Sequence, residues 1–247
     1  MSNGFLYIAF GNSFTKEALM SIRSLKRYND EPVALFTDQP MHQSFRGLVD
    51  KHVQIEPAHI RAKVDFVDKT PFENTVYLDS DTLIVRNISD MFGVLDRFDV
   101  AVTNDYARKR LKYSKIVPEY EKIPYSFSEV NGGIMAYNSS EATKEFLKKW
   151  KSYFYKYYRE TSGWDQVSLR ISLWESSVRL HHFPFEYNIR SRANRDKQDL
   201  YKEQFGEQHM APRVYHLHYS PEVHRGVFEM DDLDELEKCI VEQAVWF

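Results

Sequence analysis

Asp79 and Asp81, two aspartates separated by one residue, are the part of this sequence best suited to chemistry. The β-favouring residues Val76–Leu78 precede them, and a second apolar run, Leu83–Val85, follows. Side chains at positions i and i+2 of an extended segment point the same way, so both carboxylates can converge at a strand end. Two close carboxylates repel unless they share a proton or a cation, and Mg²⁺ and Mn²⁺ prefer oxygen ligands. The pattern therefore predicts a metal site with positions left for nucleotide phosphates. A strand end with an Asx turn is the alternative.

Three further segments carry residues that could belong to such a site. His216 and His218 alternate along a strand-like segment, so they share a face, and one of them could be a metal ligand. The sequence Asn-Gly-Gly at 131–133 interrupts a β-favouring run, which indicates a close backbone approach or a simple bulge. Asp165 and Gln166 stand at the expected start of a helix, where capping is the alternative to a role in chemistry.

Composition narrows the class of protein. The chain has 247 residues, 43% of them hydrophobic, which is enough for one large globular domain or two small ones. A net charge of −3 gives no reason to expect nucleic acid or an anionic membrane as partner. The single cysteine, Cys239, excludes an internal disulfide and a cysteine zinc site. No apolar run approaches membrane-spanning length, so we expect a soluble, cytoplasmic protein without an integral membrane segment.

The first third of the chain alternates predicted strands and helices. Strands are expected at Phe5–Phe10, Pro32–Phe36, His52–Ile55 and from Thr75, and helices from Phe14 to about Asp30 and at Ala58–Val67. This order is typical of an α/β fold with a mostly parallel sheet. Ligands of such sheets bind beyond the carboxyl ends of the strands, where Asp79 and Asp81 are expected.

The remainder contains a long irregular excursion and further alternating elements. We expect strands at Asp99–Thr103, Val130–Tyr137 and Val214–Tyr219, and irregular segments at Asn104–Ser128 and Arg190–Ala211. Asn138 and Glu141 form a capping-box pattern that predicts the start of a helix. Further helices are expected at Trp164–Trp174 and Met230–Phe247. No repeat or linker interrupts this order. Residues 1–247 are therefore expected to form a single domain.

Taken in order, these segments resemble the GT-A glycosyltransferases, and most closely the glycogenin-like retaining enzymes of glycosyltransferase family 8. The likeness covers nearly the whole chain and rests on six blocks: YIAFGNSFTKEALMSIRSLKRYN, YLDSDTLIVRNISDMF, NGGIMAYN, WDQVSLR, FPFEYN and VYHLHYS. It implies a single Rossmann-like α/β domain with a mixed, mostly parallel sheet flanked by helices. It also implies transfer of a sugar from a nucleotide-sugar donor, expected to be a UDP-sugar, to a saccharide or other glycosyl acceptor.

The resemblance implies a role for each matching position. Asp79, Asp81 and His216, with His218 as the alternative, would bind Mn²⁺ or Mg²⁺. Asp165 and Gln166 would line the reacting face, and retention would involve either this pair in catalysis or an acceptor-assisted reaction on the same face. The donor would be contacted by the following residues: Phe10, Gly11, Asn12, Lys63, Asp79, Ser80, Asp81, Asn131, Gly132, Gly133 and Arg225.

The sequence departs from the family pattern near its end. The family glycine after the histidine segment, and the lysine beyond it that binds the diphosphate, have no obvious counterpart. Arg225, or an arginine of the cluster Arg190, Arg192 and Arg195, could bind the phosphates instead, because a guanidinium pairs with phosphate in a bidentate manner. A solvated loop is the alternative for the cluster.

Two other functions are compatible with parts of the pattern. A catalytically silent protein of the same fold would bind a nucleotide sugar without turnover. A phosphohydrolase of the haloacid-dehalogenase type also carries Asp-x-Asp after a strand, but usually near the first strand and with Thr or Val two residues later, where this chain has Leu83.

Overall fold

The computed structural model of the chain describes residues 2–57, 59, 62–190, 204, 206, 211–217, 235 and 238. These residues fall into two compact units. Unit 1 comprises residues 1–6, 57–77 and 91–183, and unit 2 comprises residues 7–56, 78–90 and 184–247. The expectation that residues 1–247 form a single domain stays a prediction.

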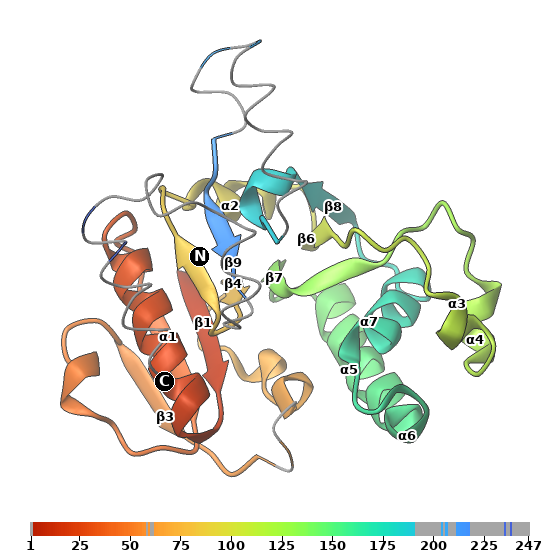
Figure 1. Cartoon of the computed structure of the whole chain (residues 1–247), viewed down its shortest axis with the longest axis horizontal. Helices are drawn as coiled ribbons and strands as arrows, with labels where there is room; N and C mark the ends of the chain where they lie inside the picture. Colours follow the sequence, from red (N-terminus) through yellow and green to blue (C-terminus); the bar gives the residue numbers. More distant parts are fainter. Residues whose placement is uncertain are drawn as a thin grey trace. The chain divides into compact units, whose positions relative to one another are not determined.

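The strands form a seven-stranded sheet in the order β3-β2-β1-β4-β7-β6-β8 (Figure 1). Its strands are β1 (Asn3–Ala9), β2 (Val33–Thr37), β3 (Lys51–Gln54), β4 (Asn74–Leu78), β6 (Val100–Asn104), β7 (Val130–Asn138) and β8 (Leu180–Phe183). The β1–β4, β2–β3 and β6–β8 pairs are parallel, and the β6–β7 pair is antiparallel. The expected mixed, mostly parallel α/β sheet is thereby confirmed. A second sheet pairs β5 (Thr82–Ile84) with β9 (Val214–His216).

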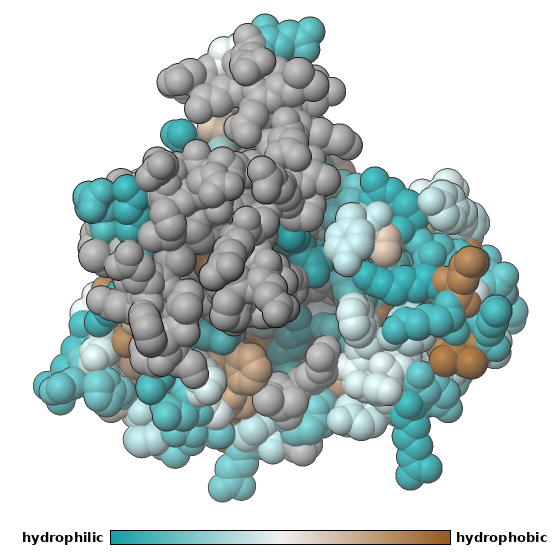
Figure 2. All heavy atoms as spheres, viewed as in Figure 1, coloured by the Kyte–Doolittle hydropathy of each residue, from teal (hydrophilic) through white to brown (hydrophobic). Residues whose placement is uncertain are grey.

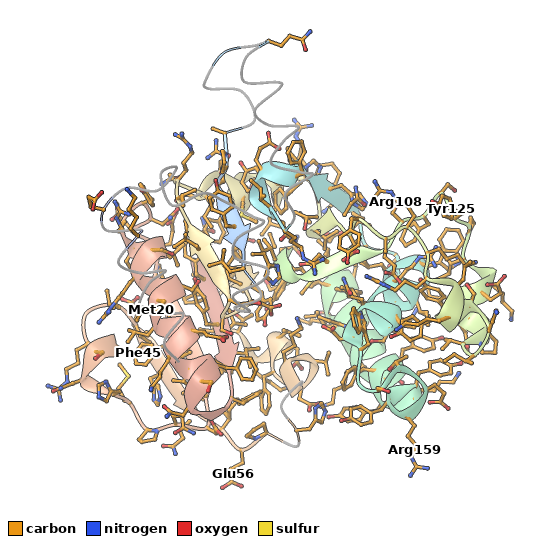
Figure 3. The ribbon with its side chains drawn as sticks, viewed as in Figure 1. Met20, Phe45, Glu56, Arg108, Tyr125 and Arg159 are labelled. Carbon is orange, nitrogen blue, oxygen red and sulfur yellow. The ribbon has the colours of Figure 1, made fainter. Side chains whose placement is uncertain are left out.

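In unit 2, helix α1 (Gly11–Lys26) packs against β2 and β5. Its apolar residues Ala18, Ile22 and Leu25 are fully buried, as their helical spacing predicts. The helix begins three residues before the expected Phe14, because Gly11 (φ +79°) turns the chain directly out of β1. Short 3-10 helices at Gln43–Phe45 and Phe185–Tyr187 complete the described part of the unit, which also carries Met20 and Phe45 as buried side chains (Figure 3).

Buried hydroxyl groups join α1 to the strand that follows the two aspartates. The hydroxyl of Ser21 lies 3.0 Å from that of Tyr7 and 2.7 Å from that of Thr82. Ser24 Oγ accepts the backbone N–H of Ile84 at 2.9 Å. Because buried polar groups are costly without partners, these bonds fix β5 against α1 and with it the turn that carries the aspartates.

In unit 1, helices α5 (Glu141–Lys156) and α7 (Asp165–Trp174) pack against each other, and α7 packs on β7. In the sequence, the short helix α2 (Asp90–Val94) precedes β6, and α6 (Tyr158–Thr161) lies between α5 and α7. The N-cap of α5 is Ser140, whose Oγ accepts the Thr143 N–H, so the expected capping box at Asn138 is wrong. Asn138 Oδ1 instead accepts the N–H of Ser140, two residues later, in the turn that precedes the helix.

The expected irregular excursion at 104–128 is ordered around its own small core. Two short helices, α3 (Leu111–Ser114) and α4 (Pro118–Lys122), bury Tyr113 and Tyr120 together with Val167 and Ile171 of α7. The sequence shows little periodicity here because each helix is only about one turn long. Arg108 and Tyr125 mark this excursion in Figure 3.

Several expected elements differ from the structure or lie outside it. In place of an α-helix at Ala58–Val67, the described residues form 3-10 helices at Ala62–Asp65 and Val67–Lys69. Strand β8 was not expected, since its sequence, LHHF, has only one residue that becomes buried. The segment 191–200 and nearly all of the expected helix Met230–Phe247 lie outside the described residues.

The described surface is largely polar. On the face seen in Figure 2, hydrophobic side chains appear in small separate groups among hydrophilic ones. Within the described residues, every helix is too short or too polar to cross a membrane.

Candidate active site

The turn between β4 and β5 carries Asp79 and Asp81, which both belong to unit 2. Strand β4 ends at Leu78, and β5 begins at Thr82, whose hydroxyl donates to the Asp79 carbonyl at 2.9 Å. The expectation that both carboxylates lie along one extended segment is therefore wrong, and the turn brings them together instead. Antiparallel pairing of β5 with β9 places Thr82 opposite His216, and the Leu217 N–H donates to the Asp81 carbonyl at 2.7 Å.

Asp79, Asp81 and His216 converge as predicted. The His216 Nε2 atom lies 3.1 Å from Asp81 Oδ1 and 3.8 Å from Asp79 Oδ2. One potential ligand atom from each residue lies within 4.8 Å of the other two. The His216 side chain is 2% exposed, whereas those of Asp79 and Asp81 are 26% and 19% exposed. The imidazole is thus shielded from solvent, whereas the two carboxylates are partly exposed to it. His218, the alternative ligand, lies outside the described residues.

Asn188 orients the imidazole of His216. The Nδ1 atom of His216 lies 3.1 Å from the Asn188 side-chain oxygen, and both residues are buried. An amide oxygen only accepts, so Nδ1 donates to it, and a neutral imidazole would then offer its Nε2 lone pair to a metal held by the carboxylates. This tautomer is the one that a metal-binding histidine requires. Asn188 was not among the predicted site residues. The FPFEYN block that contains it was the available signal.

A third carboxylate, Glu17 of α1, lies beside the same turn. The Ser80 hydroxyl donates to Glu17 Oε2 at 3.1 Å. Burial raises the pKa of Glu17 to about 7, with further contributions from the charges of Asp81 and Asp79, while the hydrogen bond from Ser80 acts in the opposite direction. Because three carboxyl groups around one turn repel one another when ionised, a bound cation would be favourable there. The sequence pattern gave no signal for Glu17, which occupies a polar position of an amphipathic helix.

The end of β1 holds the predicted residues Phe10, Gly11 and Asn12. Phe10 is buried, Asn12 is exposed, and the Gly11 N–H donates to Asp38 Oδ1 at 2.8 Å. Although burial acts in the opposite direction, hydrogen bonds from Gln39 and Gly11 lower the pKa of Asp38. Asp38 directly follows β2 and was missed, although an acid at the carboxyl end of a parallel strand is a usable signal.

Unit 1 holds a second group of predicted residues. Lys63 Nζ lies 3.2 Å from Asp165 Oδ2 and donates to the Gly132 carbonyl at 3.2 Å. Asn131 is buried, and its Oδ1 accepts the N–H of Gly133 at 3.1 Å. The structure therefore gathers Lys63, Asp165 and the Asn-Gly-Gly segment in one place.

The two glycines of that segment interrupt the β6–β7 ladder. Val102 pairs with Met135, but the next residue, Thr103, pairs with Asn131, so the register jumps across the glycines. A Cβ atom on Gly132 would lie 3.1 Å from Leu169 Cδ2 and 3.5 Å from Asp165 Oδ2. The irregularity and the close approach that the sequence indicated are both present.

Gln166 is buried next to Asp165. Its amide nitrogen donates to Asp105 Oδ2, and its oxygen accepts from Trp164 Nε1. Asp105 was missed, because it lies in the excursion that has no readable pattern. The predicted phosphate-binding residue Arg225, with Arg192 and Arg195, lies outside the described residues.

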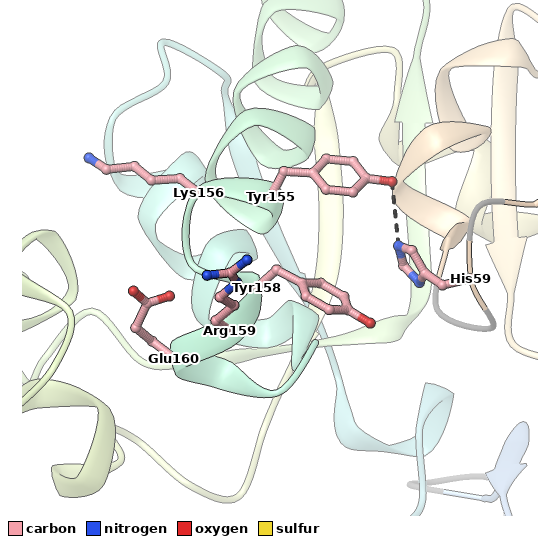
Figure 4. A pocket seen from close by; sticks show the side chains of 6 residues that line it. All are labelled: His59, Tyr155, Lys156, Tyr158, Arg159 and Glu160. Carbon is pink, nitrogen blue, oxygen red and sulfur yellow. Dashed lines mark hydrogen bonds between the residues drawn. The ribbon is translucent and has the colours of Figure 1, made fainter.

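A surface hollow in unit 1 contains none of the predicted site residues (Figure 4). Its volume is about 500 Å³, and its lining consists of His59, Tyr155, Lys156, Tyr158, Arg159 and Glu160. The rings of Tyr155 and Tyr158 point toward His59, and the Tyr155 hydroxyl lies 3.4 Å from His59 Nε2.

Comparisons with known proteins show the family and the fold of this chain. The sequence profile of the nucleotide-diphospho-sugar transferase family matches residues 73–220, which include Asp79, Asp81, Asp165 and His216. A comparison with curated protein sequences found no match.

Solved glycosyltransferase structures share the fold. The glycosyltransferase GlyE of Streptococcus pneumoniae TIGR4 superposes with a TM-score of 0.60 at 14% identity, over 99% of this chain and 60% of GlyE. The galactosyltransferase LgtC, in complex with donor and acceptor sugar analogues, gives 0.60 at 12% identity, over 98% of this chain and 95% of LgtC. Mouse xyloside xylosyltransferase 1 gives 0.58 at 13% identity, over 87% and 97%. This chain thus spans less than two thirds of GlyE. The expected GT-A fold is confirmed.

Proposed function

Because the chain belongs to the nucleotide-diphospho-sugar transferase family, we propose that it transfers a sugar from a UDP-sugar to a saccharide acceptor with retention of configuration. The observation that carries this proposal is the convergence of Asp79, Asp81 and His216. Retention and the uridine nucleotide come from the family-8 resemblance. The single cysteine, Cys239, suits a reducing compartment, and we propose a cytoplasmic location on that basis.

The donor set at this site suits a hard or borderline divalent cation. Two carboxylates and a neutral imidazole fit Mn²⁺ or Mg²⁺ and leave coordination positions for diphosphate oxygens. When bound, the ion neutralises the charge that develops on the departing nucleotide. Asn188 would orient His216 so that Nε2 faces the ion, and the partly exposed carboxylates would provide the open side.

The remaining residues of unit 2 would bind the nucleoside part of the donor. Phe10, Gly11 and Asn12 stand at the carboxyl end of β1, the position where α/β sheets bind ligands. Asp38, fixed by the Gly11 N–H, is an acceptor at the end of the adjacent β2. We assign Ser80 to the donor site together with the two aspartates that flank it.

The residues of unit 1 receive the roles that the family resemblance implies. Lys63 would contact the donor, and Asn131, Gly132 and Gly133 would approach the sugar closely, since the two glycines have no side chain to keep it away from the backbone. Asp165 and Gln166 would line the reacting face and take part in catalysis. The grouping of these side chains around Gly132 supports a common role. Arg225 would bind the phosphates.

The decisive experiment is metal-dependent donor turnover by the purified protein. A panel of nucleotide sugars is incubated with Mn²⁺, with Mg²⁺ or with EDTA, and release of the free nucleotide is measured. We expect turnover of at least one UDP-sugar with Mn²⁺ and loss of turnover in Asp81→Asn. Asp96→Asn, an exposed carboxylate outside the site, is the matched control and should retain activity. Equal turnover with and without EDTA would contradict the proposal.

A catalytically silent binder is the second candidate, since a site that binds nucleotide and metal need not turn a donor over. It predicts thermal stabilisation by UDP and Mn²⁺ without breakdown of any donor, with or without acceptors. The phosphohydrolase alternative has no support from the family match, and release of phosphate from an aryl phosphate would be required to revive it.

A further inference from the structure

The side chain of Gln166 is held at both ends by groups of unit 1. Its Nε2 atom donates to Asp105 Oδ2 at 2.7 Å and to the Val130 carbonyl at 3.3 Å. Its Oε1 atom accepts the indole N–H of Trp164 at 2.6 Å. The residue is 5% exposed. Both amide hydrogens are therefore engaged, whereas the oxygen keeps a second lone pair.

The chemistry of these partners fixes the orientation of the amide. The carboxylate of Asp105 and the carbonyl of Val130 only accept hydrogen bonds, so they must face the NH₂ group. The indole of Trp164 only donates, so it must face the oxygen. A rotation of the amide by half a turn would place acceptor against acceptor and donor against donor, which is costly in a buried site.

Asp105 is fixed in turn by donors from its own segment. Its Oδ1 atom accepts the Ala107 N–H at 2.9 Å and Arg110 Nη2 at 3.2 Å. The side chain has no solvent exposure. Arg110 also pairs through Nη1 with Glu129, which is equally buried and accepts the hydroxyl of Tyr120. One guanidinium thus serves two buried carboxylates.

Arg110 also contacts the residue at the other end of the Gln166 amide. Its guanidinium carbon lies 5.1 Å from the ring centroid of Trp164. A planar guanidinium can pair with carboxylates along its edge and stack on an aromatic face at the same time, which an ammonium group cannot do. Asp105 and Trp164, the two polar partners that determine the amide orientation, therefore both depend on Arg110.

We propose that Asp105, held by Arg110, is a positioning residue that keeps the Gln166 amide in one orientation and leaves only its oxygen for a substrate. The excursion at 104–128 is then part of the active-site framework. This inference rests on the proposed function for the role of Gln166. The geometry of the three side chains does not depend on it.

Kinetics provide the first test. Asp105→Asn keeps the shape, but the three partners described above, Gln166, Ala107 and Arg110, all donate to the carboxylate, so an amide must turn its NH₂ group against at least one of them. Arg110→Lys keeps the positive charge, but the ammonium group cannot bind two carboxylates through separate nitrogens or stack on the Trp164 ring. We expect both variants to lower kcat for donor turnover 10- to 100-fold, with the donor KM changed less than threefold. Combining Asp105→Asn with Gln166→Ala should lower kcat no further than Gln166→Ala alone.

A matched arginine–aspartate pair supplies the control. Arg179 binds Asp99 through Nε at 3.1 Å and Nη2 at 2.9 Å in the same unit, and neither residue contacts Gln166 in the described structure. Arg179→Lys should lower the melting temperature and leave kcat within twofold. Equal losses of kcat in Arg179→Lys and Arg110→Lys, or additive effects in the double variant, would overturn the proposal.

A second test works without turnover. Indole N–H resonances of ¹⁵N-tryptophan-labelled protein number at most four, and Trp164→Phe identifies the one from Trp164. Asp105→Asn and Arg110→Lys should shift that resonance, while Arg179→Lys should not. An unmoved Trp164 resonance in both variants would overturn the inference. If the wild type turned over no nucleotide sugar, the proposed function would fail, and this spectrum would still decide whether Asp105 and Arg110 hold the amide.

Discussion

The imidazole Nδ1 of His216 lies 3.1 Å from the side-chain oxygen of Asn188, in a pair that is almost entirely buried. His216 and Asn188 come from different segments, joined where the His216 N–H donates to the Ile189 carbonyl at 2.9 Å. This contact decides which imidazole nitrogen faces the two aspartates. A hydrogen bond of this kind fixes the tautomer and the ring orientation of a metal-binding histidine.

Replacing Asn188 by alanine should therefore weaken Mn²⁺ binding about 10- to 100-fold, because the imidazole loses the acceptor that fixes its tautomer. Calorimetric titration of the purified protein with Mn²⁺ measures the effect. Asn87→Ala, an exposed asparagine whose side chain donates to the Tyr28 carbonyl, is the control and should leave the Mn²⁺ affinity unchanged. Equal affinities for wild type and Asn188→Ala would show that Asn188 has no such role.

Mn²⁺ should raise the melting temperature of the wild type but not that of Asp81→Asn. A ligand at about 100 times its Kd stabilises the folded state by about 2.7 kcal/mol. Removing Asp81 takes away the carboxylate closest to His216 Nε2. Differential scanning fluorimetry with and without Mn²⁺ provides the measurement, with Asp96→Asn as control. Full stabilisation of Asp81→Asn by Mn²⁺ would place the cation elsewhere.

Gly132→Ala should reduce donor turnover with a modest cost in stability. The added methyl would press on Leu169 and approach Asp165 and Lys63, the groups assigned to the donor sugar. Overpacking of this kind costs about 1–3 kcal/mol. Gly93→Ala is the matched control, since a Cβ there meets nothing within 4 Å and alanine favours the helix α2. If kcat/KM of Gly132→Ala equalled that of the wild type, the sugar would not lie at this segment.

Asp99 should make part of the stability depend on pH. Hydrogen bonds from Arg179 lower the pKa of Asp99 to about 2, against the effect of burial. Because the folded-state pKa lies below the unfolded value, the contribution is present above about pH 4 and is lost as pH falls toward 2. Such a shift corresponds to about 2 kcal/mol, which solvent around the exposed Arg179 reduces to about 1 kcal/mol.

Urea denaturation of Asp99→Asn and the wild type at pH 7 and pH 2.5 checks this expectation. The variant should be less stable by about 1 kcal/mol at pH 7, and this difference should shrink to roughly a third at pH 2.5. A difference that stayed the same at both pH values would mean that the charge of Asp99 does not contribute.

The sequence by itself determined the elements whose apolar residues recur at the spacing of a helix or form a continuous buried strand. The helix face of Ala18, Ile22 and Leu25 and the strand before Asp79 were readable, because three- and four-residue spacing and continuous apolar runs each imply a buried surface. The acid pair and the double glycine were also readable, since both are unusual in a β-favouring context. The one-turn helices of the excursion and strand β8 could not be predicted, because segments this short show no recognisable periodicity of apolar residues.

Only the tertiary structure decided which distant groups meet. The pairing of β5 with β9 brings His216 to Asp81, and the packing of α1 brings Glu17 to Ser80. Asn188 and Asp105 acquired their places in the same way, through contacts between segments far apart in the chain. Such contacts depend on long-range packing and on hydrogen bonds between buried groups, which no local pattern of residue types encodes.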